Sequence, residues 1–178
     1  MIFLFLSGCT TLTVAELEEK YGTQRPVIKS YFASDTIRNG DVWKVYFSAH
    51  DPDGDMEFIV TTIDQTGAIY DTELMIIEKE DRETITGYIY LNIPTRGIWF
   101  ERIKLTLSIL DKAEHKSNKV VFPLYICNKM SQPLPPEFGE EFNRPLGWIP
   151  TRLISPHYQY LEDPEIMGHP DSYRGIWD

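Results

Sequence analysis

Cysteine and basic residues are scarce in this sequence of 178 residues, and each shortage excludes a class of function. Two cysteines, Cys9 and Cys127, are too few for a disulfide framework, and neither belongs to a CxxC pair that could bind zinc, attach haem or exchange disulfides. Seventeen basic residues stand against 27 acidic ones, which gives a net charge of −10. Because this charge opposes a phosphate backbone, we expect no nucleic-acid partner.

Sequence motifs of catalysis are missing as well. The chain contains no GxSxG nucleophile turn, no phosphate-binding loop and no dinucleotide fingerprint. Adjacent acids occur at Glu140 and Glu141, but neighbours in sequence point apart on a strand or repel each other on a loop. A glycosidase instead needs two acids held across a cleft. The sequence therefore predicts a protein that is not an enzyme and has no organic cofactor.

Alternation of apolar and polar residues is the main structural signal. Residues 43–49 place their odd-numbered side chains on an apolar face, and residues 102–109 set four aliphatic residues against four polar ones. Further strands are predicted at 28–33, 56–63, 68–71, 74–78, 85–93 and 119–127. The predicted core consists of the inward-facing residues Trp43, Val45, Phe47, Ile89, Leu91, Ile103, Leu105, Leu107, Ile109, Phe122 and Leu124.

Turn-forming residues separate these segments, for example Asn39-Gly40 and the run Asp-Pro-Asp-Gly-Asp at 51–55. About seven or eight short strands without long helices between them are typical of an antiparallel sandwich rather than of βαβ units. We therefore predict an all-β fold, with one antiparallel β-sandwich over residues 26–128.

Two motifs resemble the bacterial Ig-like, PKD and cadherin-like extracellular repeats. The first is the Asp-rich run at 51–55 after the strand that begins at Trp43, and the second is the stretch at 111–118. In those families the second motif usually reads Asp-x-Ala-Gly-Asn-x-Ser, whereas Glu114 and His115 replace the Gly and Asn here. The resemblance covers about 100 residues and implies an immunoglobulin-like sandwich. It implies little about function, because this fold serves many unrelated roles.

A calcium site is one interpretation of the acidic run. Asp51, Asp53 and Asp55 alternate, so an extended chain would place three carboxylates on one face, and such hard oxygens bind calcium. Asp111 or Glu57 could complete the site through the fold, although the order of an EF-hand is not met. The alternative is a solvated turn in which the Asp side chains cap neighbouring N–H groups.

The first nine residues resemble the end of a bacterial lipoprotein signal peptide, with a lipobox at Leu6-Ser7-Gly8-Cys9. The resemblance implies a lipid on Cys9 and, because no Asp follows the cysteine, a location at the outer membrane of the bacterial cell envelope. The apolar run is shorter than the usual length of about 7–15 residues, which a start upstream of Met1 would explain. A short buried strand is the alternative. A membrane helix needs about 20 apolar residues, so a lipid is the only membrane anchor that we expect.

Residues 10–25 are predicted to form a linker or a short helix. Thr13 and Glu16 fit a capping box, and Gly22 lies where a helix over 14–21 would need a left-handed stop. A helix this short is marginal in water unless it packs on the domain.

Residues 129–178 hold eight of the twelve prolines, a density that opposes regular helices and central strands. The segment is nevertheless rich in aromatic residues, which an inert linker would not need. We predict an extended arm that binds a partner through these side chains; the alternative is an arm that covers an edge of its own sheet. The predicted partner-binding residues are Phe138, Phe142, Trp148, Tyr158, Tyr160, Tyr173 and Trp177.

Two functional hypotheses follow. The first is a lipid-anchored structural or accessory subunit of a larger envelope assembly, with the sandwich as a rigid block and residues 129–178 as the partner-binding arm. The second is an adhesion or glycan-binding module with a weak calcium site in the sandwich loops. Loops 51–55 and 111–118 contain no aromatic residue that could stack on a sugar, which favours the first hypothesis.

Overall fold

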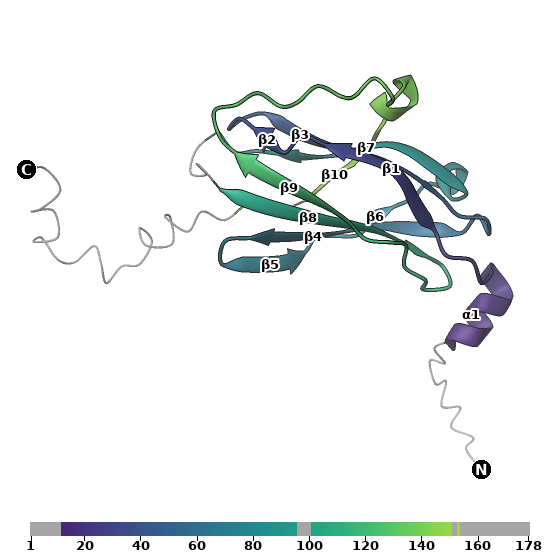
Figure 1. Ribbon diagram of the computed structural model, residues 1–178. Helices are drawn as coiled ribbons and strands as arrows, with labels where there is room; N and C mark the ends of the chain where they lie inside the picture. Colours follow the sequence, from purple (N-terminus) through teal and green to yellow (C-terminus); the bar gives the residue numbers. More distant parts are fainter. Residues whose placement is uncertain (1–11, 96–100, 151–152, 154–178) are drawn as a thin grey trace, which may run out of the picture.

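Two β-sheets pack face to face in the computed structural model, which describes residues 12–95, 101–150 and 153 (Figure 1). The elements in chain order are α1 (Val14–Tyr21), β1 (Val27–Ala33), β2 (Thr36–Ile37), β3 (Val42–His50), β4 (Met56–Gln65), β5 (Ala68–Asp71), β6 (Met75–Ile76), the 3-10 turn η1 (Lys79–Asp81), β7 (Thr84–Asn92), β8 (Arg102–Asp111), β9 (Val120–Ile126), the 3-10 turn η2 (Glu140–Asn143) and β10 (Pro145–Trp148).

The sheets have four and six strands. The first has the order β1-β3-β7-β10, and the second has the order β2-β9-β8-β4-β5, with β6 also paired to β4. Most neighbours are antiparallel, whereas the short strands β2 and β10 add in parallel to β9 and β7. The all-β sandwich predicted from the alternation is confirmed, with these two parallel strands added to it.

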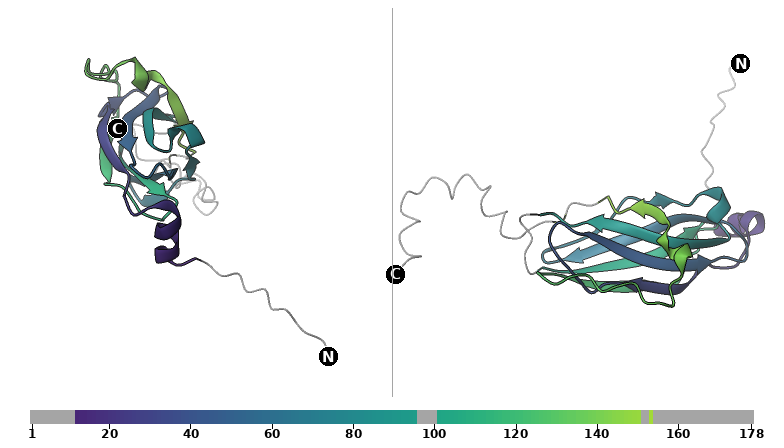
Figure 2. Two further views of the ribbon diagram at one scale, coloured as in Figure 1. Left: turned by 90° about the vertical axis from the view of Figure 1, so that its right-hand side faces the viewer. Right: turned by 90° about the horizontal axis from the view of Figure 1, so that it is seen from above.

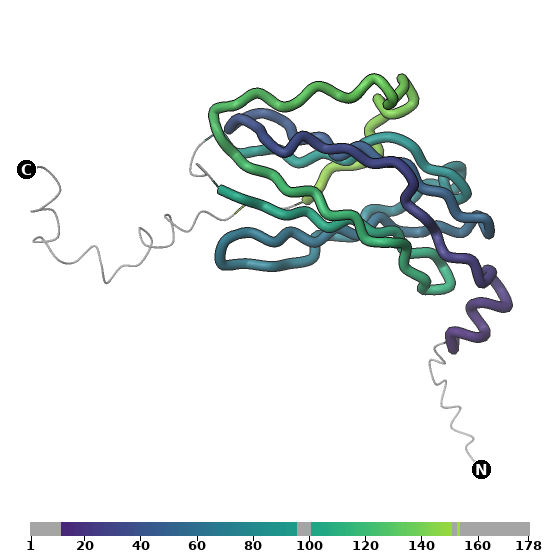
Figure 3. Tube along the Cα trace, viewed as in Figure 1, coloured from purple at the N-terminus to yellow at the C-terminus, as the bar shows by residue number. Residues whose placement is uncertain are grey.

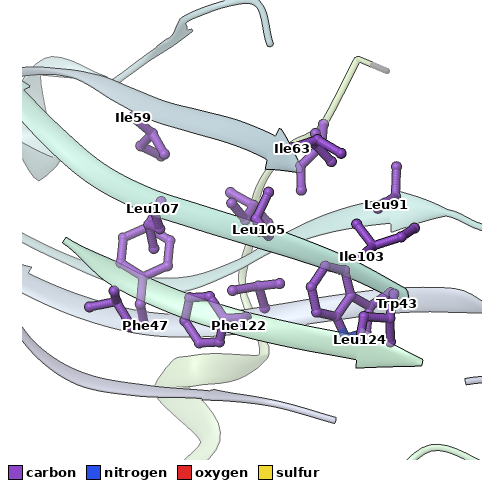
Figure 4. Close-up of a cluster of buried hydrophobic side chains, with 14 of the residues drawn as sticks. Trp43, Phe47, Ile59, Ile63, Leu91, Ile103, Leu105, Leu107, Phe122 and Leu124 are labelled. Atoms are coloured by element: carbon purple, nitrogen blue, oxygen red, sulfur yellow. The ribbon is translucent and has the colours of Figure 1, made fainter. Parts of the chain in front are cut away.

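The core lies between the sheets, and every residue predicted to face inward is buried (Figure 4). Trp43 is 1% exposed, and its indole Nε1 donates a hydrogen bond to the Ser34 carbonyl oxygen at 2.8 Å. Ser34 lies where the chain leaves β1 in one sheet and enters β2 in the other. A buried indole N–H requires an acceptor, so this bond fixes the segment between the two sheets against the core.

Helix α1 has the predicted bounds and projects from one end of the sandwich (Figure 2). Its capping box is complete: the Thr13 side chain accepts from the Glu16 N–H, and the Glu16 carboxylate accepts from the Thr13 N–H at 2.7 Å. The helix ends at Gly22, whose φ of 117° favours glycine. Among the described residues, no helix is long and apolar enough to cross a membrane.

Residues 130–149, which we call the strap, run back over the four-stranded sheet (Figure 3). The Phe138 ring lies 5.9 Å from the ring of Phe32 in β1 and 4.7 Å from that of Phe142, measured between centroids. Phe142 and Ile149 are both buried. The Arg144 guanidinium forms two hydrogen bonds of 2.9 and 2.8 Å with the carboxylate of Asp81.

The prediction that the partner-binding arm starts at residue 129 therefore needs correction, because the strap belongs to the domain. Pro145 opens β10 at the edge of the sheet, where a missing N–H is tolerated. Gly87 in β7 makes room for this strand, since a Cβ there would collide with the carbonyl oxygen of Arg144. The Tyr88 N–H donates to that same oxygen at 2.9 Å. The fold thus continues beyond residue 128 to Ile149 and Leu153, which are both buried.

Candidate functional site

Three of the four predicted calcium ligands meet at the end of the sandwich that carries α1. Strand β3 ends one residue before Asp51, and β4 begins one residue after Asp55. Strand β8 ends at Asp111, which pairs with Met56 across the β4–β8 ladder. The pairing register of the six-stranded sheet therefore places Asp111 beside the loop at 51–55.

The carboxylates of Asp51, Asp55 and Asp111 form a compact buried cluster. One oxygen from each lies within 4.8 Å of the others. The three residues are 0%, 6% and 1% exposed. The Oδ2 atoms of Asp51 and Asp55 are buried without a hydrogen-bond partner. A buried charged oxygen without a partner is costly, so the cluster needs protons or a cation.

Backbone hydrogen bonds hold two of these carboxylates in place. The Asp53 N–H donates to Asp51 Oδ1 at 3.1 Å, and the His115 N–H donates to Asp111 Oδ1 at 2.7 Å. Asp53 itself, the fourth predicted ligand, does not join the cluster. Its carboxylate accepts from the Gln24 N–H at 2.7 Å, after the end of α1. Of the three alternating Asp residues that were predicted to share one face, Asp51 and Asp55 therefore join the cluster, whereas Asp53 caps the chain after α1.

Burial shapes the electrostatics of the cluster. It raises the pKa of Asp55 from 3.8 to about 6, and the neighbouring carboxylate of Asp51 adds to this rise. Burial also raises the pKa of Asp111, against the lowering effect of the hydrogen bond from the His115 N–H. Both carboxyl groups therefore release their protons less readily than a solvated Asp does.

His115 connects the cluster to α1, a contact that the sequence did not predict. Its Nδ1 lies 3.2 Å from Asp111 Oδ2, and its Nε2 lies 3.0 Å from Glu18 Oε1. The hydrogen bond to Glu18 raises the pKa of His115, and the charge of Asp111 acts in the same direction. The replacement of the usual Gly and Asn of the second motif by Glu114 and His115 was the signal in the sequence that this loop differs.

The predicted partner-binding aromatics divide between the strap and the remaining chain. Phe142 is buried, and Phe138 is half-buried against the rings of Phe32 and Phe142, so both pack on the domain itself. Trp148 in β10 is 55% exposed. The other predicted residues, Tyr158, Tyr160, Tyr173 and Trp177, lie outside the described residues, as does Cys9.

Trp148 belongs to a larger aromatic surface. It pairs with Tyr90 in β7, and Tyr88 in the same strand pairs with Tyr46 in β3. All three tyrosines are half-buried and alternate with buried core residues, so they lie on the outer side of the four-stranded sheet. Tyr46, Tyr88, Tyr90 and Trp148 are called the aromatic face from here on.

Comparisons with known proteins identify no family. No protein-family model matches the sequence, and no curated protein matches it. Among solved structures, the chain is similar to the CARDB domain of a Pyrococcus furiosus protein, crystallised in complex with di-metal ions. The similarity covers 60% of this chain and 96% of that domain, with 8% sequence identity and a TM-score of 0.35.

Proposed function

We propose that this chain is a non-enzymatic structural or accessory subunit of a larger assembly in the bacterial cell envelope, anchored by a lipid on Cys9. In this proposal the sandwich is a rigid block, and it contacts its partner through the aromatic face and the residues that follow the strap. The strap itself completes the block, because its buried residues Phe142 and Ile149 belong to the domain.

The exposure of Trp148 is the observation that carries this proposal. An indole that is 55% exposed on an edge strand loses favourable burial unless another surface covers it. Its neighbours Tyr88 and Tyr90 extend the same surface. Tryptophan and tyrosine are the residues that most often dominate the energy of protein interfaces. The segment with the remaining predicted contact residues follows this strand directly in sequence.

The arrangement of the rings favours a protein partner over a glycan. Tyr46 and Tyr88 are inclined at 55° to each other, and Tyr88 and Tyr90 at 56°, so the rings do not form a flat platform for stacked sugars. The Lys44 ammonium lies 4.5 Å from the centroid of the Tyr88 ring and occupies its face. The glycan-binding hypothesis is therefore the weaker of the two.

Copurification of a stoichiometric partner from native membranes tests the proposal. The full chain is compared with Trp148→Ala, with a chain that ends after Leu153, and with the control Ile69→Ala. Ile69 is 73% exposed on β5 in the opposite sheet, so its substitution removes a similarly exposed apolar group away from the aromatic face. Trp148→Ala should weaken binding by about 2 kcal/mol or more, roughly 30-fold in Kd, with an unchanged Tm.

Three results would contradict the proposal. Recovery of the partner could be unaffected by Trp148→Ala and by removal of residues 154–178. Ile69→Ala could reduce recovery as strongly as Trp148→Ala does. Finally, the purified chain could bind a glycan array through the aromatic face, which would support the adhesion or glycan-binding function instead.

A further inference from the structure

We propose that the carboxylates of Asp51, Asp55 and Asp111 bind one divalent cation, with calcium as the expected ion. The cluster is more than a group of acids in sequence, because all three side chains are over nine-tenths buried. Two of their oxygens have no hydrogen-bond partner, although they lie in a part of the molecule that excludes water.

The spacing of the oxygens fits a single ion. Calcium binds oxygen at about 2.3–2.6 Å, so two oxygens on opposite sides of one ion can be about 4.6–5.2 Å apart. The oxygens of Asp51, Asp55 and Asp111 lie within 4.8 Å of one another, and an ion among them could contact all three without a rearrangement of the backbone. The unpartnered Oδ2 atoms of Asp51 and Asp55 are free to coordinate.

The hydrogen bonds around the cluster leave it preorganised for an ion. The Asp53 N–H binds Asp51 Oδ1 and the His115 N–H binds Asp111 Oδ1, and these bonds fix the directions of the two carboxylates. These donors do not balance the charge. In the described residues, His115 is the one basic side chain recorded in contact with the cluster, and Glu18 shares its imidazole. A divalent cation would supply the missing positive charge.

Calcium fits this donor set better than magnesium does. Magnesium requires near-ideal octahedral geometry at about 2.0–2.1 Å and usually retains several waters, whereas calcium accepts irregular sets of carboxylate and carbonyl oxygens. Asp51 and Asp55 in one loop and Asp111 at the end of β8 supply three carboxylates, hard oxygens that calcium accepts without a fixed geometry.

The test uses the full chain stripped of cations with EGTA, titrated with calcium chloride by calorimetry and by thermal unfolding. Asp55→Asn removes one ligand charge and keeps the shape of the side chain. Asp53→Asn is the matched control, because it lies two residues away, outside the cluster, and an Asn oxygen can still accept from the Gln24 N–H. Magnesium chloride is titrated in parallel.

The proposal predicts one calcium bound per chain and a Tm that rises by several degrees in millimolar calcium, in the wild type and in Asp53→Asn alike. Asp55→Asn should lose at least tenfold in calcium affinity. Without calcium its Tm should equal or exceed that of the wild type, because the substitution relieves repulsion; this result separates loss of binding from misfolding.

Other results would overturn the proposal. One is the absence of both heat and a Tm shift in millimolar calcium, which would leave shared protons to balance the cluster. Another is equal loss of binding in Asp53→Asn and Asp55→Asn, since that pattern indicates non-specific attraction to surface acids. Binding of magnesium alone would overturn the assignment to calcium.

Discussion

Glu18 and His115 are 97 residues apart in sequence, yet Glu18 Oε1 lies 3.0 Å from His115 Nε2. The pair joins α1 to the loop after β8. None of the residues of α1 is buried, so the helix has no core contact to keep it on the sandwich. Polar contacts of this kind hold the helix, together with the bond from the Gln24 N–H to Asp53.

Glu18→Gln should loosen α1 without unfolding the sandwich. The substitution removes the charge that faces His115, and the helix is too short to be stable alone. Hydrogen exchange should become faster for the amides of α1, while the strands stay protected. The control is Glu19→Gln on an exposed position of the same helix. Equal exchange rates in the two variants would show that the contact with His115 does not hold the helix.

In protein freed of divalent cations, the free energy of unfolding should fall as the pH rises from about 4 to about 6. The pKa of Asp55 is 3.8 when solvated and about 6 in the fold, so in this range the folded state keeps a proton that the unfolded state releases. The titration of Asp55 changes the free energy of unfolding by at most about 1.4 kcal/mol per pH unit.

The raised pKa of His115 acts with the same sign at higher pH. The contribution of His115 to the free energy of unfolding is complete below pH 6.5, and it is lost as the pH rises through the raised pKa of the folded state. Urea unfolding at a series of pH values measures both effects. Asp55→Asn should flatten the acidic part of the profile, and an identical profile in that variant would disprove this cause.

Leu105→Ala should cost about 2–5 kcal/mol, because Leu105 is fully buried between the sheets and the substitution leaves a cavity. Leu107→Ala should behave in the same way. Val121→Ala, on a residue that is 53% exposed in the neighbouring strand, should cost less than about 0.5 kcal/mol. Urea unfolding measures the difference, and a loss below about 1 kcal/mol at both leucines would contradict the packing in Figure 4.

Patterns among neighbouring residues predicted the elements that depend on interactions between neighbours in the sequence. The capping residues Thr13 and Glu16 predicted α1, and strict alternation predicted the faces of β3 and β8. Asp51 and Asp55 were assigned to a site because alternating Asp residues share one face of an extended chain. Their burial, however, depends on the pairing of Met56 with Asp111, a property of the β4–β8 register that no local pattern reports.

The strap was predicted only as the alternative, an arm that covers an edge of its own sheet, because its cause is distant in sequence. Its prolines favour an extended chain, and an extended chain can either leave the domain or lie along the edge of a sheet. Gly87 decides between these outcomes, since a glycine within a strand often marks the close approach of another backbone. The contact between Glu18 and His115 likewise spans loops that no sequence period connects.

Gly87→Ala should displace β10 from β7. The added methyl group would collide with the Arg144 carbonyl oxygen, and that oxygen accepts from the Tyr88 N–H. The amide of Ile149, which donates to the Tyr90 carbonyl oxygen at 2.7 Å, should exchange faster, and the Tm should fall. Unchanged protection of Ile149 would show that the strap tolerates the methyl group.

Cys9→Ser should move the protein from the membrane pellet to the soluble fraction if Cys9 carries a lipid, because each buried CH₂ of an acyl chain contributes about 0.8 kcal/mol to membrane binding. Cys127→Ala is the control, since this free cysteine is buried in the fold. Unchanged fractionation of Cys9→Ser would indicate attachment through protein contacts or no attachment.

The strand directions also determine how the sandwich would respond to mechanical tension. The chain enters β1 at Val27, opposite His50, and it leaves β10 beyond Trp148, opposite Tyr90 towards the far end of β7. The step from Thr84, which lies opposite His50, to Tyr90 in β7 separates these two points by about 20 Å along the strands. A pull between entry and exit would run along the strands, perpendicular to the antiparallel hydrogen bonds. Those bonds would be loaded together in shear rather than broken one by one, so the sandwich can transmit force between attachments at its two ends.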